Sequence, residues 1–382
     1  MDAIIVPSAR PSSNLAHATG LAAAQGCPLL VLCSKRADAA GAVAEGEKTG
    51  TNVVAVNVTG REPFVPPAPF ATTGMLAGTR FATPSDLSFK RNAGLSLSRM
   101  AGWRNILFLD DDIHGVPSST VTDAATLLDA GGAVDIVGLR NNGFPDNSVL
   151  CHAYRAAGGQ QDTFIGGGAM AVSVDRVRAF FPAVYNEDWL FFVRSLAAGR
   201  AVVTGVAAQE SYDPFASPRR ARFEEFGDCL AEGIYYLLDQ GGSVDDADGP
   251  FWSDFIARRR RFIVAVKKAS EGGASDRTVM ALRAALESNI LLTWQRYVRY
   301  LDCWRADTAR WNEWFETLDV VGDVELALEK LEVGFSSTGR SRPAVTTTDH
   351  AEPAAAPALG WLRRFRSRRP APGSVVLTGQ AR

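Results

Sequence analysis

The chain has 382 residues, of which 46% are hydrophobic and 21% are charged, and its formal net charge is −2 at pH 7. These proportions are typical of a water-soluble globular protein, and the near-zero charge gives no basic field for binding nucleic acid. The sequence contains no run of about eighteen apolar residues and no basic leader, so we expect a cytoplasmic protein without a transmembrane segment. The five cysteines lack C-x-x-C spacing, so we expect free thiols and neither disulfides nor a zinc site.

Apolar runs at residues 3–6, 28–32 and 52–58 predict three strands with helices between them. This β-α-β-α-β opening is typical of a nucleotide-binding α/β domain with a mainly parallel sheet. No glycine-rich phosphate loop follows the first strand, which argues against a dinucleotide enzyme and against a P-loop NTPase. Arg10 and Lys35 follow strand ends, where a base or phosphate would lie, and solvated loop charges are the alternative interpretation.

The apolar run at residues 105–109 predicts a buried strand, and Asp110, Asp111 and Asp112 follow its carboxyl end. Three consecutive carboxylates are costly to bury unless something positive compensates them. Ligands of open α/β sheets bind at this edge. A divalent cation, Mn²⁺ or Mg²⁺, shared with substrate phosphates is the simplest compensator. A solvated acidic loop or a helix N-cap cluster is the alternative.

Further elements are predicted up to about residue 215. They are a loop at 60–83, a helix near 87–100 that carries Lys90, Arg91 and Asn92, a helix at 118–129, strands at 134–139, 149–154, 164–172 and 201–206, and a short helix from 174. Three adjacent glycines at 166–168 allow a close backbone approach or a ligand on bare main chain, with a flexible turn as the alternative. Glu187 and Asp188 open an apolar helix, where carboxylates also favour the helix dipole.

The pattern changes to helical from about residue 216 and to low complexity after about 335. Amphipathic helices are predicted at 223–237, 251–266 and 278–318. The arginines at 258–261 predict a solvated helix face, with an anion site as the alternative. The Ser-, Thr-, Pro- and Ala-rich end predicts disorder, and its basic aromatic segment at 361–369 is a solubilising tail or a contact for anionic lipid. We divide the chain into an α/β domain at 1–215, a helical extension at 216–335 and a disordered tail at 336–382.

The order of these features resembles glycosyltransferases of the GT-A fold, close to the family-two type. The shared features are the Lys90-Arg91-Asn92 helix, the acidic strand end at 110–112, the glycines at 166–168 and the Glu187-Asp188 helix start. The resemblance covers about residues 1–215. It implies a Rossmann-like nucleotide-sugar-binding domain that moves a hexose-like sugar from a nucleotide-sugar donor to an acceptor hydroxyl.

The resemblance also implies roles for the matched residues. Asp110 would face the ribose or the metal, Asp112 would be the main metal ligand, and Asp188 would be the candidate catalytic acid/base with support from Glu187. The donor nucleotide would contact Pro7, Arg10, Lys35, Lys90, Arg91, Asn92, Asp110 and Asp111, and the acceptor side would include Gly166, Gly167, Gly168 and Trp189.

The sequence departs from this family at two positions. Lys35 ends the second strand where many relatives place an acidic residue, and Gln209 with Glu210 follows the last strand where a third metal ligand is expected. His114 is a possible substitute ligand. The missing Q-W acceptor motif and the lack of membrane helices favour a single transfer to a soluble or peripheral acceptor. A sugar-nucleotidyltransferase and a non-catalytic GT-A-like module that binds a nucleotide or a partner are the alternative functions.

Overall fold

The computed structural model describes residues 1–145, 147–160, 165–271 and 273–339. In this part of the chain nine strands form one sheet in the order β5-β8-β6-β7-β4-β1-β2-β3-β9. The strands are β1 (Ala3–Ser8), β2 (Leu29–Cys33), β3 (Val53–Asn57), β4 (Asn105–Leu109), β5 (Ile113–His114), β6 (Ile136–Asn141), β7 (Ala169–Ser173), β8 (Ala201–Gln209) and β9 (Ser336–Ser337). Six of them, β1 to β4, β6 and β8, run in one direction. The prediction of an α/β fold with a mainly parallel central sheet is confirmed.

The antiparallel strand β7 brings the glycine run to the acidic strand end. It lies between β4 and β6, and its first residue, Ala169, pairs with Leu109 at the end of β4. The backbone N–H of Asp110 donates to the carbonyl of Gly168 over 2.8 Å. The residues before β7 therefore lie at the same sheet edge as the residues after β1 and β4.

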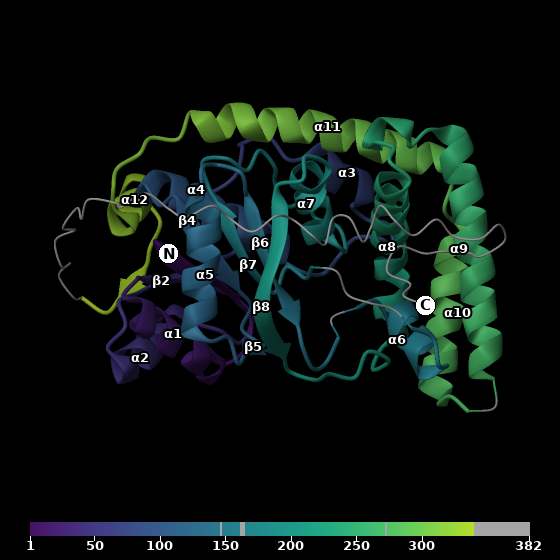
Figure 1. The fold of residues 1–382 in the computed structure, drawn as a ribbon, viewed down its shortest axis with the longest axis horizontal. Helices are drawn as coiled ribbons and strands as arrows, with labels where there is room; N and C mark the ends of the chain where they lie inside the picture. Colours follow the sequence, from purple (N-terminus) through teal and green to yellow (C-terminus); the bar gives the residue numbers. More distant parts are fainter. Residues whose placement is uncertain (146, 161–164, 272, 340–382) are drawn as a thin grey trace.

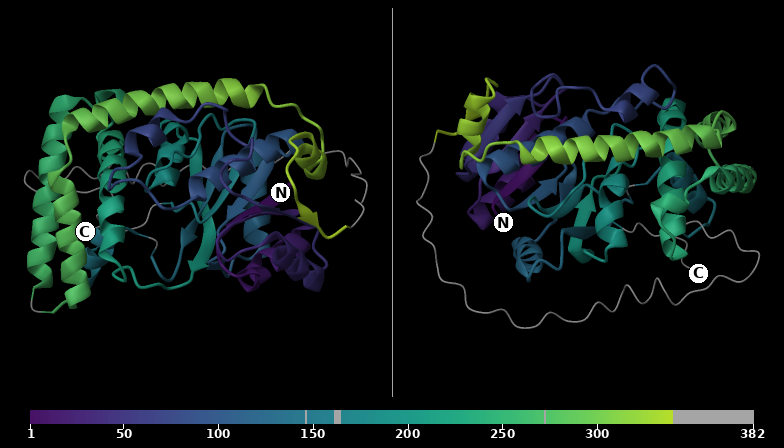
Figure 2. Two further views of the ribbon diagram at one scale, coloured as in Figure 1. Left: turned by 180° about the vertical axis from the view of Figure 1, so that it is seen from behind. Right: turned by 90° about the horizontal axis from the view of Figure 1, so that it is seen from above.

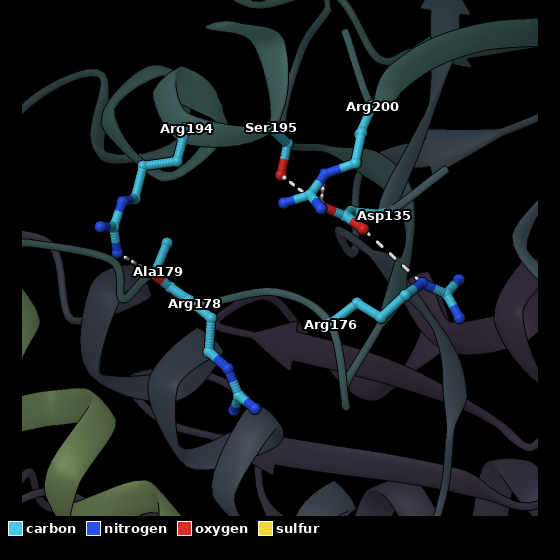
Figure 3. Close-up of a pocket in the computed structure, with 7 residues that line it drawn as sticks. All are labelled: Asp135, Arg176, Arg178, Ala179, Arg194, Ser195 and Arg200. Atoms are coloured by element: carbon cyan, nitrogen blue, oxygen red, sulfur yellow. Dashed lines mark hydrogen bonds and ion pairs between the residues drawn. The ribbon is translucent and has the colours of Figure 1, made fainter. Parts of the chain in front are cut away.

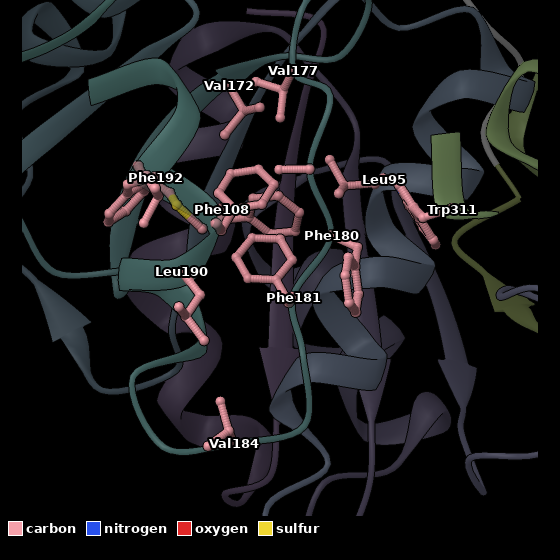
Figure 4. Packing of buried hydrophobic residues seen from close by; sticks show 14 of the residues in the cluster. Leu95, Phe108, Val172, Val177, Phe180, Phe181, Val184, Leu190, Phe192 and Trp311 are labelled. Atoms are coloured by element: carbon pink, nitrogen blue, oxygen red, sulfur yellow. The ribbon is translucent and has the colours of Figure 1, made fainter. Parts of the chain in front are cut away.

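Helices cover both faces of the sheet (Figures 1 and 2). Buried side chains of α1 (Ala16–Gln25), α2 (Ala39–Thr49) and α5 (Ser118–Asp129) form the core on one face. On the other face α4 (Leu87–Ala101) and α7 (Glu187–Ala197) enclose an aromatic core (Figure 4). The rings of Phe181 and Phe191 are stacked there at 3.9 Å, and Phe108 meets Phe181 edge-on at 5.9 Å. This core fixes α7, and with it Glu187 and Asp188, against β4.

The C-terminal part is helical, as predicted, and it returns to the sheet. The helices are α8 (Pro218–Asp239), a short 3-10 helix at Val244–Asp246, α9 (Gly249–Ser270), α10 (Asp276–Ile290), α11 (Trp294–Glu316) and α12 (Val324–Lys330). Figure 1 shows α11 running along the molecule from the α9–α10 end toward α12. The chain then forms β9, which pairs antiparallel with the edge strand β3.

Several predicted elements differ in the structure. Residues 149–154, predicted as a strand, belong to the helix α6 (Val149–Ala156), whose N-cap Ser148 accepts a hydrogen bond from the Cys151 N–H. Residues 174–176 form a turn, and no helix begins at residue 174. The predicted loop at 60–83 includes the short helix α3 (Ala71–Leu76), and the predicted helix at 278–318 is interrupted after α10.

The prediction of a solvated arginine face at 258–261 is wrong for Arg259. Its side chain is 0% exposed and forms ion pairs with Glu225, Asp228 and Glu232 of α8. A buried guanidinium with three carboxylates joins α9 firmly to α8, because removing one partner would leave uncompensated buried charge. The neighbouring Arg258 is partly exposed and pairs with Asp254 in its own helix, as a surface arginine does.

The structure tests the predictions for the cysteines, the membrane segment and the tail only within its described residues. All five cysteines are free; four are buried and Cys303 is partly exposed. Within the described residues no helix is both long and apolar enough to cross a bilayer. Ser336 and Ser337, assigned by prediction to the disordered tail, form β9. Thr338 and Gly339 of the predicted tail are also described, whereas residues 340–382, including the basic aromatic segment at 361–369, lie outside the described residues.

Candidate functional site

The Asp111 carboxylate fastens the end of β1 to the end of β4. It accepts hydrogen bonds from the Ser8 hydroxyl at 3.0 Å and from the backbone N–H groups of Ala9 at 2.7 Å and Arg10 at 2.8 Å. The Arg10 side chain also donates to it. These four hydrogen bonds occupy both oxygens of the Asp111 carboxylate within the protein itself. Its contacts are those of a residue that shapes the loop after β1.

Arg10 and Gln209 hold the third carboxylate, Asp112. The Arg10 Nη2 atom donates to Asp112 Oδ2 over 2.8 Å, and the Gln209 side-chain amide donates to the same oxygen over 3.3 Å. The Asp112 carbonyl accepts from the Glu210 N–H at 2.9 Å, which ties it to the end of β8. Both side-chain contacts fall on Oδ2, so Oδ1 is the oxygen that a ligand of this site can use.

Arg91 connects the first aspartate to the helix start at residue 187. It lies in α4 with 2% of its surface exposed. Its Nη2 atom donates to both carboxylate oxygens of Asp110 at 3.1 and 3.0 Å, and its Nη1 atom donates to Glu187 Oε1 at 2.8 Å. The guanidinium also lies over the Phe181 ring, 5.6 Å from the centroid. Two distant acidic motifs of the sequence thus share one buried cation.

Burial changes the protonation of this group. Desolvation raises the pKa of Asp110 to about 7 even though Arg91 acts to lower it. Desolvation likewise raises the pKa of Glu187 to about 8, against the Arg91 charge, and the nearby Asp188 carboxylate adds to the rise. The pKa of Asp188 is also raised by burial, and Arg91 again opposes the shift. Buried carboxyl groups whose pKa is raised toward neutrality, as for Asp110 and Glu187, are suited to accepting and releasing a proton.

Asp188 lies against the glycine run. Its Oδ2 atom accepts a hydrogen bond from the Gly167 N–H at 2.6 Å. A Cβ atom on Gly167 would lie 2.7 Å from Arg91 Nη1 and 2.7 Å from Asp188 Cβ, whereas a Cβ on Gly166 would meet nothing within 4 Å. On Gly168 it would meet Ile113 at 3.2 Å. The middle glycine is therefore the one that close packing requires.

The backbone before Glu187 is set by a left-handed residue. Asn186 is the N-cap of α7 with φ of 63°, and its side-chain amide donates to Asp228 at 3.1 Å. Asparagine tolerates this conformation better than most residues. Trp189, one turn into the helix, packs on the Tyr235 ring with centroids 4.6 Å apart. Asn186 thus aims the two acids toward Arg91 and Gly167.

Lys90 joins the ends of β1 and β2. It is 1% exposed, and its ammonium group donates to the Ser8 carbonyl at 2.7 Å and to the Ser34 hydroxyl at 2.6 Å. It also lies 3.3 Å from Asp86. Burial lowers the pKa of Lys90, against the effect of Asp86. Lys35 lies just after the end of β2 and has a φ of 57°. This conformation is uncommon for lysine and turns the chain at the end of that strand.

Three residues proposed for this site lie apart from it or serve another contact. Asn92 exchanges two 2.8 Å hydrogen bonds with the backbone of Phe181, which is a packing role. Pro7 is buried inside β1, paired with Leu32. His114 is exposed in β5 opposite Ala208 and contributes no contact to Asp112 among the described residues. Sequence reasoning missed Ser8, Ser34 and Asn186, although a serine at the end of β1 and another just after β2 were visible signals.

The donor atoms at this edge suit a hard divalent cation. Asp112 Oδ1 and the Asp110 carboxylate are hard oxygen ligands, and Mg²⁺-type ions use one or two carboxylates together with substrate phosphates. Neither aspartate belongs to a ready-made group of three ligands; among the described residues such a group occurs at Cys151, Asp228 and Glu232. A cation would therefore depend on substrate oxygens and would compete with Arg10 for Asp112.

Comparisons with known proteins give a fold likeness only. No protein-family model matches the chain, and no curated protein matches it. Glucosyl-3-phosphoglycerate synthase from Mycobacterium tuberculosis with Mn²⁺, UDP-glucose and phosphoglyceric acid is 16% identical, with a TM-score of 0.38 over 59% of this chain and 77% of that one. A further mycobacterial protein is 17% identical, with a TM-score of 0.39 over 59% and 72% of the two chains. Values this low transfer neither residues nor chemistry.

Proposed function

We propose that this chain is a glycosyltransferase that moves a sugar from a nucleoside-diphosphate donor to an acceptor hydroxyl. The observation that carries the proposal is the contact of Arg91 with both Asp110 and Glu187, because it joins two acidic groups at the carboxyl edge of a parallel sheet. The two groups face different tasks. Asp110 and Asp112 lie on the donor side with Lys90, and Glu187 and Asp188 lie on the acceptor side with the glycine run.

The donor side is suited to a leaving diphosphate. Negative charge develops on the diphosphate as its bond to the sugar breaks, and fixed positive groups that face it lower the barrier. Arg10, just after β1, pairs with Asp111 and Asp112, and Lys90 in α4 donates to the Ser8 carbonyl at the end of β1. A divalent cation held by Asp112 and Asp110 would neutralise part of the same charge.

The acceptor side is suited to removing a proton. An acceptor hydroxyl has a high pKa and needs a carboxylate within hydrogen-bond reach. We assign the base to Asp188, held in place by the Gly167 N–H, and a supporting role to Glu187, whose proton and charge are controlled by Arg91. Trp189 and the glycines at 166–168 form the proposed acceptor wall. If the transfer inverts the anomeric carbon, Asp188 takes the acceptor proton as the new bond forms.

A non-catalytic nucleotide-binding module is the second candidate. It is favoured by the contacts of Asp111 and Asp112, which are occupied by Arg10 and Gln209. Such a module would bind nucleotide through the same edge and would not turn over the donor. Among the described residues, no contact supports the sugar-nucleotidyltransferase alternative by itself.

The test is a thermal-shift and calorimetry panel of UDP-, GDP- and dTDP-sugars, each with and without Mn²⁺. A ligand that binds only the folded state raises the melting temperature by mass action. One nucleotide-sugar that raises it, with release of free nucleoside diphosphate in the presence of an acceptor mixture, supports the enzyme. Binding without release under any condition supports the module. No shift with any donor would contradict both.

A further inference from the structure

A second charged site lies at the opposite edge of the sheet. A cavity of about 290 Å³ is lined by Asp135, Arg176, Arg178, Ala179, Arg194, Ser195 and Arg200. Asp135 precedes β6, Arg200 precedes β8, and the residues at 176–179 follow β7. These are the ends of the strands that point away from Asp110 and Asp112. Helix α7 separates the two places, since it begins at Glu187 and carries Arg194 near its other end.

Three side chains that line this cavity, Asp135, Arg176 and Arg200, are held in place by ion pairs and hydrogen bonds. Asp135 is 1% exposed; it lies 2.9 Å from Arg200 Nε and 3.6 Å from Arg176 Nε, and it accepts from the Ser195 hydroxyl at 3.3 Å. The Nη2 atom of Arg176 donates to the carbonyls of Leu128 at 2.6 Å and Val134 at 2.7 Å. Two guanidinium groups are thus held before any ligand arrives, which reduces the entropy that binding must overcome.

Positive charge exceeds negative charge around the opening. Arg176 and Arg200 share the single carboxylate of Asp135, and Arg178 pairs with Glu316 of α11 at 2.5 Å. Arg194 donates to the Arg178 carbonyl at 3.1 Å and has no carboxylate partner among the described residues. Figure 3 shows Arg194 across the cavity from Arg176 and Arg200. Four guanidinium groups therefore face two carboxylates, an excess that favours a ligand with about two negative charges.

We propose that this cavity binds a small phosphate-bearing anion, such as a phosphate monoester or a diphosphate. Guanidinium groups match phosphate oxygens with two parallel N–H donors. Within the described part of the chain, Nη1 and Nη2 of Arg200 and Nε and Nη2 of Arg194 make no hydrogen bond, so these donors remain for the ligand. The volume is at the lower limit for organic ligands, about 300 Å³, which suits a sugar phosphate or diphosphate better than a whole nucleotide-sugar.

The need to neutralise Asp135 does not by itself explain why four arginines line the cavity. One buried carboxylate needs one good partner, and Arg200 supplies it at 2.9 Å. Arg194 and Arg178 make no ion pair with Asp135 among the described residues, yet both line the same cavity. Arg194 also lies in the last turn of α7, where a cation is favoured by the helix dipole. The helix dipole explains one positive charge near the C-terminal end of α7, but it does not explain four.

The test is isothermal titration calorimetry of the full chain with inorganic phosphate and with inorganic pyrophosphate, in about 0.15 M NaCl with a chelator present. The chelator removes divalent cations, so that a cation-dependent donor site does not contribute. We expect pyrophosphate to bind with a Kd of about 1 mM or tighter. Arg194→Gln should weaken that binding about tenfold, because a charge-assisted hydrogen bond is lost. Arg194 can be replaced without leaving a buried carboxylate unpaired.

Two control variants and an acidic peptide test where pyrophosphate binds. Arg222→Gln, which changes an exposed arginine paired with Glu287, should leave binding unchanged. Arg10→Gln should also leave it unchanged, because Arg10 belongs to the other sheet edge. Pyrophosphate binding that is lost in the Arg10 variant and kept in the Arg194 variant would overturn the proposal, as would no binding at all. Arg194-dependent binding of a hexaglutamate peptide without binding of pyrophosphate would assign the cavity to an acidic protein partner and overturn it too.

Discussion

Arg10 donates to Asp112 Oδ2 over 2.8 Å, so a fixed positive charge already lies on the carboxylate proposed to hold a cation. Arg10 and a metal ion would compete for Asp112, and the competition predicts a mutation that improves metal binding. In Arg10→Gln the loop after β1 should persist, because Asp111 keeps its bonds to Ser8 and to the backbone of Ala9.

We expect Arg10→Gln to bind Mn²⁺ about tenfold more tightly than the unmodified chain, since the lost hydrogen bond to a charged group contributes about 1.5–3 kcal/mol. Calorimetric titration with Mn²⁺ measures this. Asp112→Asn added to Arg10→Gln should remove the gain. An equal or weaker Mn²⁺ affinity in Arg10→Gln would show that the charge of Arg10 does not hinder cation binding at Asp112.

Gly167 and Gly166 form a matched pair of sites for alanine. Gly167→Ala would place a methyl group 2.7 Å from Arg91 Nη1 and from Asp188 Cβ, so the buried ion pairs must shift. We expect a loss of about 1–3 kcal/mol in the free energy of unfolding, measured by urea denaturation. Gly166→Ala meets nothing within 4 Å and should change stability by less than about 0.5 kcal/mol. Equal effects of both variants would mean that the glycine run is only a flexible turn.

Asp188→Asn tests the proposed base. The amide keeps the shape and one acceptor oxygen for the Gly167 N–H but cannot take a proton. Turnover should fall by about two to four decades while donor affinity stays within about threefold, and steady-state kinetics with calorimetry measures both. Near-normal turnover would place the base elsewhere at this edge.

The stability of the chain should fall as the pH rises from about 5 to 8. The folded pKa of Glu187, about 8, lies above its ordinary value, so the folded protein holds this proton more tightly than the unfolded chain does. Such a group stabilises the fold at low pH, and its contribution is lost as the pH rises through the folded pKa. Melting temperatures measured across this range should decline, and Glu187→Gln should reduce the decline by about 2 °C or more.

Asp239→Asn provides the control for that experiment. Burial alone raises the pKa of Asp239 to about 6, with no contribution from Arg91. This variant should flatten the profile only below about pH 6 and leave the segment between 6 and 8 unchanged. If Glu187→Gln changes nothing above pH 6, Glu187 is ionised in the folded protein and Arg91 holds its charge fully.

Much of the candidate site could be predicted because parallel strands carry it. Residues that follow β1 and β4 must meet at one edge, so Arg10 and Asp112 could be placed together before any coordinates were known. Which partner each carboxylate takes could not be predicted. The contact between Arg91 and Glu187 joins residues 96 positions apart and depends on how α4 and α7 pack on the shared aromatic core.

The errors in the helical region have a common physical origin. Arg259 is adjacent to three other arginines, and a run of like charge predicts exposure. Its partners Glu225, Asp228 and Glu232 are spaced by three and four residues, which places them on one face of α8. That spacing was a readable signal for a buried cation. At 149–154 the short apolar run fits a strand as well as a helix, and the Ser148 cap decides for the helix.

The pairing of β9 with β3 affects how the chain can fold during synthesis. Ser336 and Ser337 lie opposite Ala55 and Val54, and the Thr338 N–H donates to the Val53 carbonyl at 3.1 Å. The edge of β3 therefore stays unpaired until nearly 300 further residues have left the ribosome, and an open edge of this kind can join another chain. A nascent chain that stops before α12 would leave the edge of β3 open to aggregation. Residues 336–338 therefore protect β3.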